Sequence, residues 1–352
     1  MTQPDLLTRL SASETSLDAL RDRLSVRRSF STRTGTIDLI RPTESEGPPL
    51  MIKQSPQWSA AHTRGMWITL ELLRSHADQT GLAPFAATPH NWGSDPAYIC
   101  VDWVEGKDLT VWFAKTFADC ELNEAFRRSL EMSSRYASLL AHYHRAMSDT
   151  EMLEGVIPKK AETIEQAGLA VFMIAMLRGN KGVRQSERVR SICDPGPHNA
   201  IEAPDGSLWL IDLPAHLETV MVERDIARLV GRQVGAVRKF TTSWIPRLGH
   251  YRRIVDAVID GYESVGSPKN RLVVDRALVY ACLATDAALK TARTFRRLAP
   301  GAKLGAKLEA FVRELLATIL LGAGALWLRF RQPAPQQQSR RTKNPAPKAS
   351  PS

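Results

Sequence analysis

The sequence is poor in cysteine. Its 352 residues include four cysteines, Cys100, Cys120, Cys193 and Cys282, with no CxxC pair and no cysteine–histidine cluster at metal-ligand spacing. Disulfide-stabilised folds and structural zinc sites need such clusters. The sequence therefore argues against both classes and fits a reducing compartment.

Acidic residues are absent from the C-terminal end. Residues 329–352 contain six basic residues and no acid, in a background of proline, glutamine and serine. Because the net charge of the whole chain is +10, the rest of the chain carries only +4. A nucleic-acid groove needs its basic residues on a folded face, whereas a tail of this composition buries too little apolar surface to fold. The charge therefore predicts a disordered basic tail and no specific nucleic-acid binding.

Long apolar runs are also missing, since a transmembrane helix needs about 20 apolar residues. Residues 315–328 (LLATILLGAGALWL) form a run of only fourteen uncharged residues. Three interpretations stay open for this run: a packed terminal helix, contact of residues 312–352 with a membrane surface, or a short span. Asp5 and Arg9 interrupt the N-terminal end, which predicts no secretory signal. We expect a cytoplasmic protein, with peripheral membrane association as the alternative.

Turn residues and changes in hydrophobic periodicity divide the chain into four segments. Residues 1–27 are predicted to form an N-terminal helical extension, and residues 28–104 read as strands with one helix. Residues 105–328 are mainly helical, and residues 329–352 form the basic tail. This order predicts an α+β protein with a small strand-rich N-terminal lobe and a large helical C-terminal lobe.

One predicted hairpin interrupts the helical lobe. Residues 200–201 and 208–211 are short apolar segments on either side of a Pro-Asp-Gly-Ser turn. Asp194 precedes this hairpin, Asn199 opens it and Asp212 follows it, so the hairpin would hold their oxygen atoms close together. Mg²⁺ prefers oxygen ligands. The pattern therefore predicts a magnesium site at the base of the hairpin.

The same residues resemble a known family. The loop ICDPGPHNAI, followed by LWLIDLP, is similar to the catalytic segment of the protein-kinase-like superfamily, in the branch of aminoglycoside phosphotransferases, choline kinases and lipopolysaccharide-sugar kinases. The resemblance covers residues 30–265 and implies a bilobal kinase-like fold. It also implies that Asp194 is the catalytic base and that Asn199 and Asp212 bind Mg²⁺. The interval of fifty residues from His144 to Asp194 fits the small-molecule branch, whose members insert acceptor-binding helices there.

The resemblance places an ATP site in the N-terminal lobe. Lys53, in the segment MIK, would hold the α- and β-phosphates of ATP. A helix carboxylate would pair with Lys53, and Glu71 is the candidate, with Thr69 as the alternative position. The segment YICVDWVEG resembles the hinge that binds adenine through its main chain. The corresponding residues are Asp102, Trp103 and Val104.

Departures from the family pattern bear on activity. Ile192 stands where the family has a histidine, Pro214 follows the metal-binding Asp212, and no GxGxxG motif covers the phosphates. Cys193, beside the base, is predicted to be a packing residue. A later helix carries Asp225, which the resemblance assigns to bracing the catalytic loop.

The predicted function is ATP- and Mg²⁺-dependent transfer of a γ-phosphoryl group to a hydroxyl of a small molecule or sugar. Residues 148–190 would line the acceptor pocket. The departures leave two alternatives open. One is a degenerate kinase-like protein that binds nucleotide or a partner without turnover, and the other is a kinase acting on a glycolipid at a membrane surface.

Overall fold

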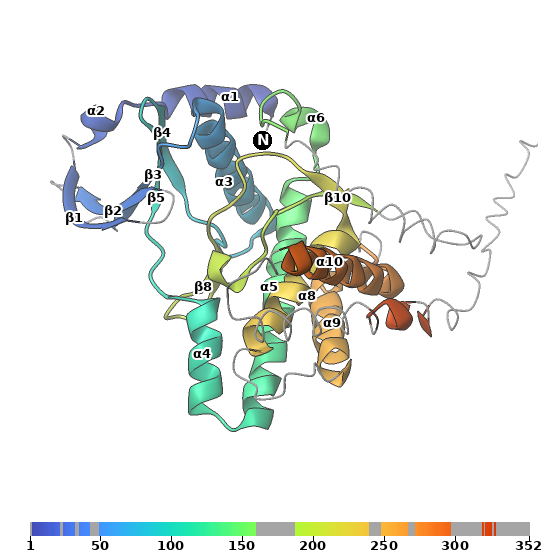
Figure 1. Ribbon diagram of the computed structural model, residues 1–352. Helices are drawn as coiled ribbons and strands as arrows, with labels where there is room; N and C mark the ends of the chain where they lie inside the picture. Colours follow the sequence, from blue (N-terminus) through green and yellow to red (C-terminus); the bar gives the residue numbers. More distant parts are fainter. Residues whose placement is uncertain are drawn as a thin grey trace, which may run out of the picture.

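The computed structural model divides into two lobes (Figure 1). It describes residues 2–21, 24–31, 35–42, 49–159, 187–238, 248–266, 272–296, 319, 321–325 and 327–328. The predicted basic tail and most of the predicted acceptor insert lie outside the described residues.

An antiparallel five-stranded sheet forms the N-terminal lobe, in the strand order β1-β2-β3-β5-β4. Its strands are β1 (Leu24–Ser31), β2 (Thr36–Pro42), β3 (Leu50–Gln54), β4 (Pro89–Ser94) and β5 (Ala97–Asp102). The apolar run of β5 is buried along almost its whole length, as its sequence predicts. β3 pairs with β5 so that Lys53 lies opposite Ile99 in the middle of the sheet. Strands and one helix are present in residues 28–104 as predicted. β1, however, begins at Leu24, inside the segment 1–27 that is expected to be helical, and β4, with the sequence PHNWGS, carries no alternating pattern that predicts a strand.

Helix α3 (Ala60–Thr80) packs on β4 and β5. It begins at Ser59, whose side chain accepts a hydrogen bond from the His62 N–H, and ends at Gly81 in the left-handed conformation with φ 66°. Both are common forms of helix capping. Gly65 lets α3 approach the C-terminal lobe closely, because a Cβ there would lie 2.1 Å from the Ala215 carbonyl oxygen. The helix therefore reaches the segment that directly follows Asp212.

Two short helices at the N-terminal end, α1 (Gln3–Ala12) and α2 (Leu17–Arg21), pack against this lobe. Leu6 and Leu10 are buried in the main core, and Leu17 lies in a smaller core with Ile40, Ile52 and Tyr98. The Trp92 indole also donates a hydrogen bond to the Leu10 carbonyl at 2.9 Å. The predicted helical extension thus contributes to the core of the N-terminal lobe.

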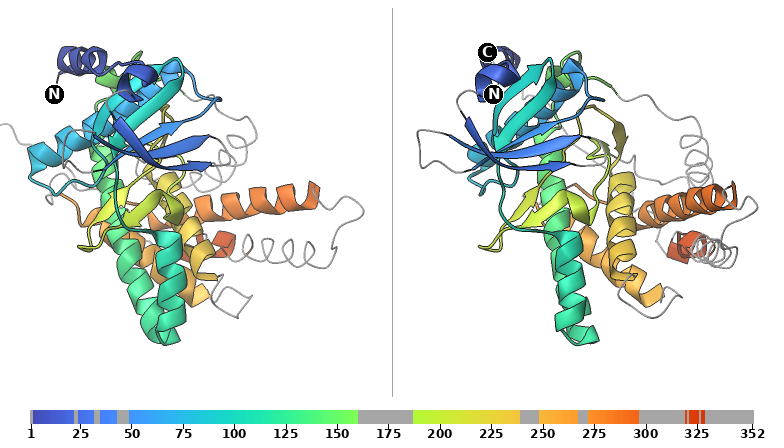
Figure 2. Two further views of the ribbon diagram at one scale, coloured as in Figure 1. Left: turned by 90° about the vertical axis from the view of Figure 1, so that its left-hand side faces the viewer. Right: turned by 60° about the vertical axis from the view of Figure 1, so that its left-hand side comes forward.

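The C-terminal lobe is mainly helical and lies on the other side of the hinge that follows β5 (Figure 2). It contains β6 (Lys107–Asp108), α4 (Leu109–Asp119), α5 (Leu122–Ala146), α6 (Thr150–Leu153), α8 (Val222–Arg238), α9 (Leu248–Glu263) and α10 (Arg276–Arg296). Helix α5 packs along α9, and α8 packs along α10. These helices bury their apolar stripes in one continuous core with α3.

The predicted hairpin is present between α5 and α8. It consists of β8 (Ala200–Glu202) and β9 (Leu208–Leu210), with β6 as a third strand on the β8 edge. Gly206 takes φ 83° in the turn, a conformation that glycine adopts without steric cost. A second ribbon pairs β7 (Arg188–Arg190) with β10 (Thr219–Met221). The two ribbons bracket the loop that carries Asp194 and the loop that carries Asp212.

Part of the uncharged run at 315–328 is described and is helical. Leu321 and Ala325 are buried, and Gly324 faces Tyr280 of α10, whereas Ile319 and Trp327 are exposed. Within the described part of the chain, no helix has the length and apolarity that crossing a bilayer requires. The packed-helix interpretation accounts for the two buried positions.

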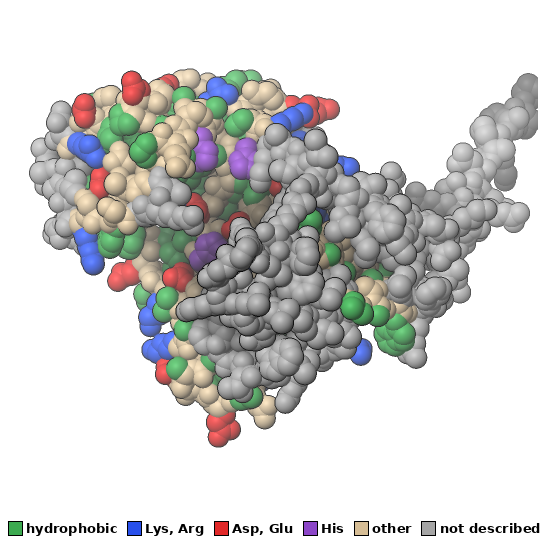
Figure 3. All heavy atoms as spheres, in the orientation of Figure 1, with side chains coloured by type: hydrophobic (Ala, Val, Ile, Leu, Met, Phe, Trp, Pro, Cys, Tyr) green, Lys and Arg blue, Asp and Glu red, His purple; other side chains and the backbone are tan. Residues whose placement is uncertain are grey.

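The visible face of the described surface mixes charges of both signs (Figure 3). Lysine and arginine side chains are interspersed with aspartate and glutamate, and no continuous basic patch covers the described residues on this face.

Candidate active site

Asp194 lies in the loop between β7 and the short 3-10 turn η1 (Pro197–Asn199). Pro197 begins the turn, and Gly196 precedes it at a position where a Cβ would collide with the His198 ring at 2.3 Å. Asn199 is buried at 6% exposure and donates from Nδ2 to the Asp194 carbonyl at 3.0 Å. The amide therefore holds the loop closed around Asp194.

The hairpin brings Asn199 and Asp212 together. Ala200 pairs with Leu210, and the Ile211 N–H donates to the Asn199 carbonyl at 2.9 Å, so Asp212 follows directly beside Asn199. Across the lobe boundary, the Lys53 ammonium forms an ion pair with the Asp212 carboxylate. The Lys53 ammonium also lies 5.6 Å from the centre of the Trp58 ring, within cation–π range. The ion pair thus joins β3 to the loop after β9.

The carboxylate of Asp194 faces the guanidinium of Arg232 and the ring of His198. Arg232 Nε of α8 lies 3.1 Å from Oδ1, in a geometry that makes an ion pair but no hydrogen bond. His198 Nε2 lies 3.6 Å from Oδ2. Arg232 was not singled out from the sequence, because one arginine on a basic helix face carries no motif.

A buried network behind the loop fixes its main chain. Asp225, fully buried on α8, accepts hydrogen bonds from the Ser191 hydroxyl at 2.5 Å and from the Ile192 N–H at 2.9 Å. Its carboxylate also contacts His144 Nε2 at 3.2 Å, and His144 Nδ1 contacts the Tyr262 hydroxyl at 2.7 Å. The structure therefore places Asp225 against the loop, as the resemblance implies.

The charge balance of this network favours the ionised carboxylate. Burial on its own raises the pKa of Asp225, but the His144 hydrogen bond and charge, the Arg228 charge and the Ser191 hydrogen bond outweigh it and lower that pKa below its usual value. Arg228 also bonds Glu218 through both terminal nitrogens at 3.3 Å. The main chain of Ile192 is therefore held by a carboxylate that stays ionised.

Cys193 occupies an unusual backbone conformation. It has φ 67° and Asp212 has φ 54°, and they are the two non-glycine residues with positive φ in the described ranges. Such conformations cost free energy and cluster at functional sites. The Cys193 Sγ lies 3.7 Å from His216 Nε2 and 3.7 Å from Glu218 Oε2. The sequence reveals no base near this thiol, since His216 and Glu218 follow 23 and 25 residues later without a motif.

Glu71 does not pair with Lys53 in this structure, contrary to the pairing expected from the sequence. Its buried carboxylate forms an ion pair with Arg9 of α1 and accepts two hydrogen bonds from Arg74, at 3.1 Å and 2.6 Å. The helix instead turns Thr69 toward the site, where its hydroxyl lies 3.3 Å from the Pro214 carbonyl. The alternative position, Thr69, is therefore the one that faces the loop after Asp212.

The three predicted hinge residues differ in the hydrogen bonds that their main-chain N–H groups make. The Asp102 N–H donates to Thr88 at 3.1 Å, and the Trp103 N–H donates to Pro49 at 3.0 Å. Within the described residues, the Val104 main chain makes no hydrogen bond. The Asp102 carboxylate contacts His90 Nε2 at 2.7 Å. Burial raises the pKa of Asp102, but this contact helps to lower it below its usual value. Of the three predicted residues, Val104 offers the unoccupied N–H donor.

The oxygen ligands predicted for Mg²⁺ form a partial set. No three His, Cys, Asp or Glu side chains in the described ranges are arranged to hold a metal ion. Mg²⁺ is commonly held by one or two protein oxygens, with phosphates and water completing its shell. Asn199 and Asp212, whose main chains are neighbours at the base of the hairpin, would supply two oxygen ligands to a shared site of that kind.

Comparison with known proteins identifies the fold. No protein-family model matches the chain, and no curated protein matches its sequence. The structure of amicoumacin kinase hAmiN in complex with AMP-PNP, Ca²⁺ and Ami superposes with a TM-score of 0.54 at 9% identity, covering 90% of this chain and 96% of that one. An ethanolamine kinase of Plasmodium vivax (TM-score 0.49, 12% identity, 88% and 86% covered) and choline kinase LicA of Streptococcus pneumoniae (0.47, 14%, 88% and 96%) are also similar. The chain therefore has the bilobal kinase-like α+β fold predicted from its sequence.

Proposed function

We propose that the protein transfers the γ-phosphoryl group of ATP to a hydroxyl of a small molecule. The observation that carries this proposal is the ion pair between Lys53 and Asp212, whose side chains come from different lobes and meet beside the loop of Asp194 and Asn199. Phosphoryl transfer needs a cation on the phosphates, oxygen ligands for the metal and a carboxylate near the nucleophile. The candidate site supplies residues for each of these needs.

In this proposal the acceptor hydroxyl attacks the γ-phosphorus while the bond to the β–γ bridging oxygen breaks, and ADP leaves. Asp194 accepts the hydroxyl proton, and Lys53 turns from Asp212 to the α- and β-phosphates. Val104 donates its N–H to the adenine, with Asp102 and Trp103 completing the hinge. Bound Mg²⁺, held by Asn199 and Asp212, would neutralise phosphate charge. Arg232, now paired with Asp194, would place a cation where negative charge develops.

The test measures binding and turnover separately. Asp212→Ala should abolish Mg²⁺-dependent ATP binding, because it removes a metal ligand and the partner of Lys53. Asp194→Asn should stop turnover but leave nucleotide bound. Calorimetric titration of ATP with Mg²⁺, and ATP consumption over a panel of sugars, amino alcohols and antibiotics, give the two readouts. Turnover that stays unchanged in both variants would refute the assignment.

A second candidate function is nucleotide or partner binding without turnover. Two observations favour it: Ile192 replaces the family histidine, and Arg232 occupies the carboxylate of Asp194. Binding of ATP without consumption on any acceptor would support this function. Removing the competing cation with Arg232→Met would then show whether the ion pair alone suppresses activity.

Contact with a glycolipid at a membrane surface stays a prediction, because residues 312–352 lie largely outside the described ranges. Deleting these residues and measuring co-sedimentation with anionic vesicles tests it. Equal sedimentation of the full chain and the truncated chain would remove this possibility.

A further inference from the structure

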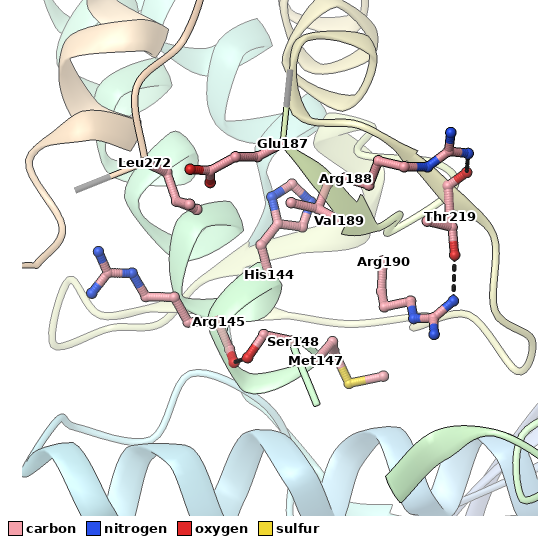
Figure 4. A pocket seen from close by; sticks show the side chains of 10 residues that line it. All are labelled: His144, Arg145, Met147, Ser148, Glu187, Arg188, Val189, Arg190, Thr219 and Leu272. Carbon is pink, nitrogen blue, oxygen red and sulfur yellow. Dashed lines mark hydrogen bonds between the residues drawn. The ribbon is translucent and has the colours of Figure 1, made fainter. Parts of the chain in front are cut away.

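A pocket lies between the C-terminal end of α5 and the ribbon of β7 and β10 (Figure 4). Its volume is about 380 Å³, within the size range of small-molecule sites. Its lining includes Arg145, Arg188 and Arg190 but only one acid, Glu187. Lys53, Asp194, Asn199 and Asp212 do not line it, so it is separate from the proposed ATP site.

Arg190 is the most informative residue of this pocket. It is 5% exposed, and its Nε has no hydrogen-bond partner. One terminal nitrogen bonds the Thr219 hydroxyl, which is neutral, and no ion pair joins Arg190 to a carboxylate of the described residues. A guanidinium stays protonated in proteins. A buried and unpaired charge is costly unless a counter-ion compensates it, so Arg190 points to an anionic ligand.

Arg188 extends the same cationic surface. Arg188 and Arg190 are two residues apart on β7 and so project from one face of the strand, while Val189 between them is buried in the core. The Arg188 guanidinium donates to the Thr219 carbonyl at 3.5 Å. The two guanidinium groups thus lie on either side of Thr219, as Figure 4 shows.

The acid of the pocket lies away from this pair. Figure 4 shows Glu187 on the opposite side, near Arg145 and Leu272. Arg145 is also engaged elsewhere, because it donates to the Val265 carbonyl at 2.6 Å. The two arginines of β7 therefore keep a local excess of positive charge.

We propose that this pocket binds a small molecule through a phosphate group, held by Arg188 and Arg190. Paired arginine donors match the geometry of phosphate oxygens, and such charge-assisted hydrogen bonds are stronger than neutral ones. The Thr219 hydroxyl, opposite Arg190 in the ribbon, orients the buried guanidinium. Because Arg190 directly precedes Ser191 and Ile192, the bound phosphate would lie next to the segment that Asp225 braces.

Isothermal titration of inorganic phosphate into the full chain, at constant ionic strength set with sodium chloride, tests the proposal. Wild type should bind phosphate more tightly than malonate, a carboxylate probe. Arg190→Met should weaken phosphate binding roughly tenfold or more, since a charge-assisted hydrogen bond is lost. Arg188→Met should weaken it as well, and serves as the second variant if Arg190→Met does not fold. Arg127→Met, which removes an exposed arginine elsewhere on α5, should bind like wild type.

The outcome also distinguishes this pocket from the ATP site. Lys53→Met should retain phosphate binding. The proposal is overturned if wild type binds no phosphate or prefers malonate. It is also overturned if both β7 variants bind phosphate as wild type does, or if only Lys53→Met loses binding.

Discussion

The C-terminal lobe contributes buried groups that position Asp194 in the candidate site. The N-terminal lobe contributes Lys53, whose ion pair with Asp212 lies near solvent. The side chains of His144 and Asp225 are fully buried, and Asp225 accepts a hydrogen bond from the Ile192 N–H. The side chain of Asp212, by contrast, is 52% exposed in its ion pair with Lys53.

This difference separates a fixed part of the site from an exchangeable one. A protein loses much stability when one partner of a buried, hydrogen-bonded charge pair is removed. The loop that carries Asp194 is therefore held in place before any ligand binds. Exposed ion pairs contribute little and are screened by salt. Under the proposed function, Lys53 would exchange Asp212 for the phosphates of a nucleotide at small cost.

Removing the buried acid should have the largest effect. Asp225→Ala removes the buried acceptor of the Ser191 hydroxyl and the Ile192 N–H and the carboxylate partner of His144, and we expect it to lower the free energy of unfolding by about 3–5 kcal/mol. Urea denaturation measures this loss. Asp205→Ala, in the exposed hairpin turn, is the matched control and should change stability little. Equal losses in the two variants would mean that the C-terminal side is no more fixed than the surface.

Glu71 offers the sharpest test of the N-terminal side. Glu71→Gln weakens the buried pairing with Arg9 and Arg74, so we expect a loss of stability of roughly 1–3 kcal/mol. ATP affinity should stay at the wild-type value, because the carboxylate is directed at α1 and not at Lys53. Glu131→Gln on the surface of α5 controls for the charge change. A fall in ATP affinity as large as that of Lys53→Met would restore the conventional pairing.

The parts of the site that follow local sequence patterns were predictable. The hairpin, the interval from Asp194 to Asn199 and the lysine of β3 depend on turn chemistry and apolar periodicity, which neighbouring residues determine. The direction of Glu71 depends instead on Arg9, 62 residues away on a helix whose docking no local pattern reveals. The contacts of Cys193 with His216 and the unpaired Arg190 arise in the same way, from packing between distant segments.

The junction of the lobes should respond to acid. His76 of α3 and His142 of α5 lie 3.4 Å apart through ring nitrogens. Burial, followed by the charges of His76 and Arg145, lowers the pKa of His142 to about 4, and burial with the Arg145 charge lowers that of His76. An unfolded histidine has a pKa of about 6.5, so the unfolded chain binds more protons below that pH. The stability contributed by the neutral rings is thus present above about pH 6.5 and is lost as the pH falls toward 4.

This loss can be measured by comparing variants. Between about pH 7 and pH 5, the free energy of unfolding should fall less in His142→Gln than in wild type. The difference should be about 1 kcal/mol or less, because both rings are half-exposed and water screens their charges. Thermal unfolding at each pH gives the comparison. The Asp225 carboxylate should not contribute in this range, because its lowered pKa confines its own titration to more acidic solutions. If the stability of wild type and of His142→Gln falls equally with pH, the histidine pair is not the acid-sensitive contact.

The smallest effect is expected at Cys193, where the fixed and exchangeable parts of the site meet. Cys193 is partly exposed between Ile192 and Asp194, whereas burial raises the pKa of the Cys100 and Cys282 thiols to about 12. Since the thiolate is the reactive form, iodoacetamide near neutral pH should label Cys193 and leave the two buried cysteines unmodified. ATP with Mg²⁺ should slow labelling of Cys193 but not of Cys120, the residue that ends α4. Peptide mass spectrometry over time measures both rates, and labelling of Cys193 that is indifferent to nucleotide would separate this thiol from the ATP site.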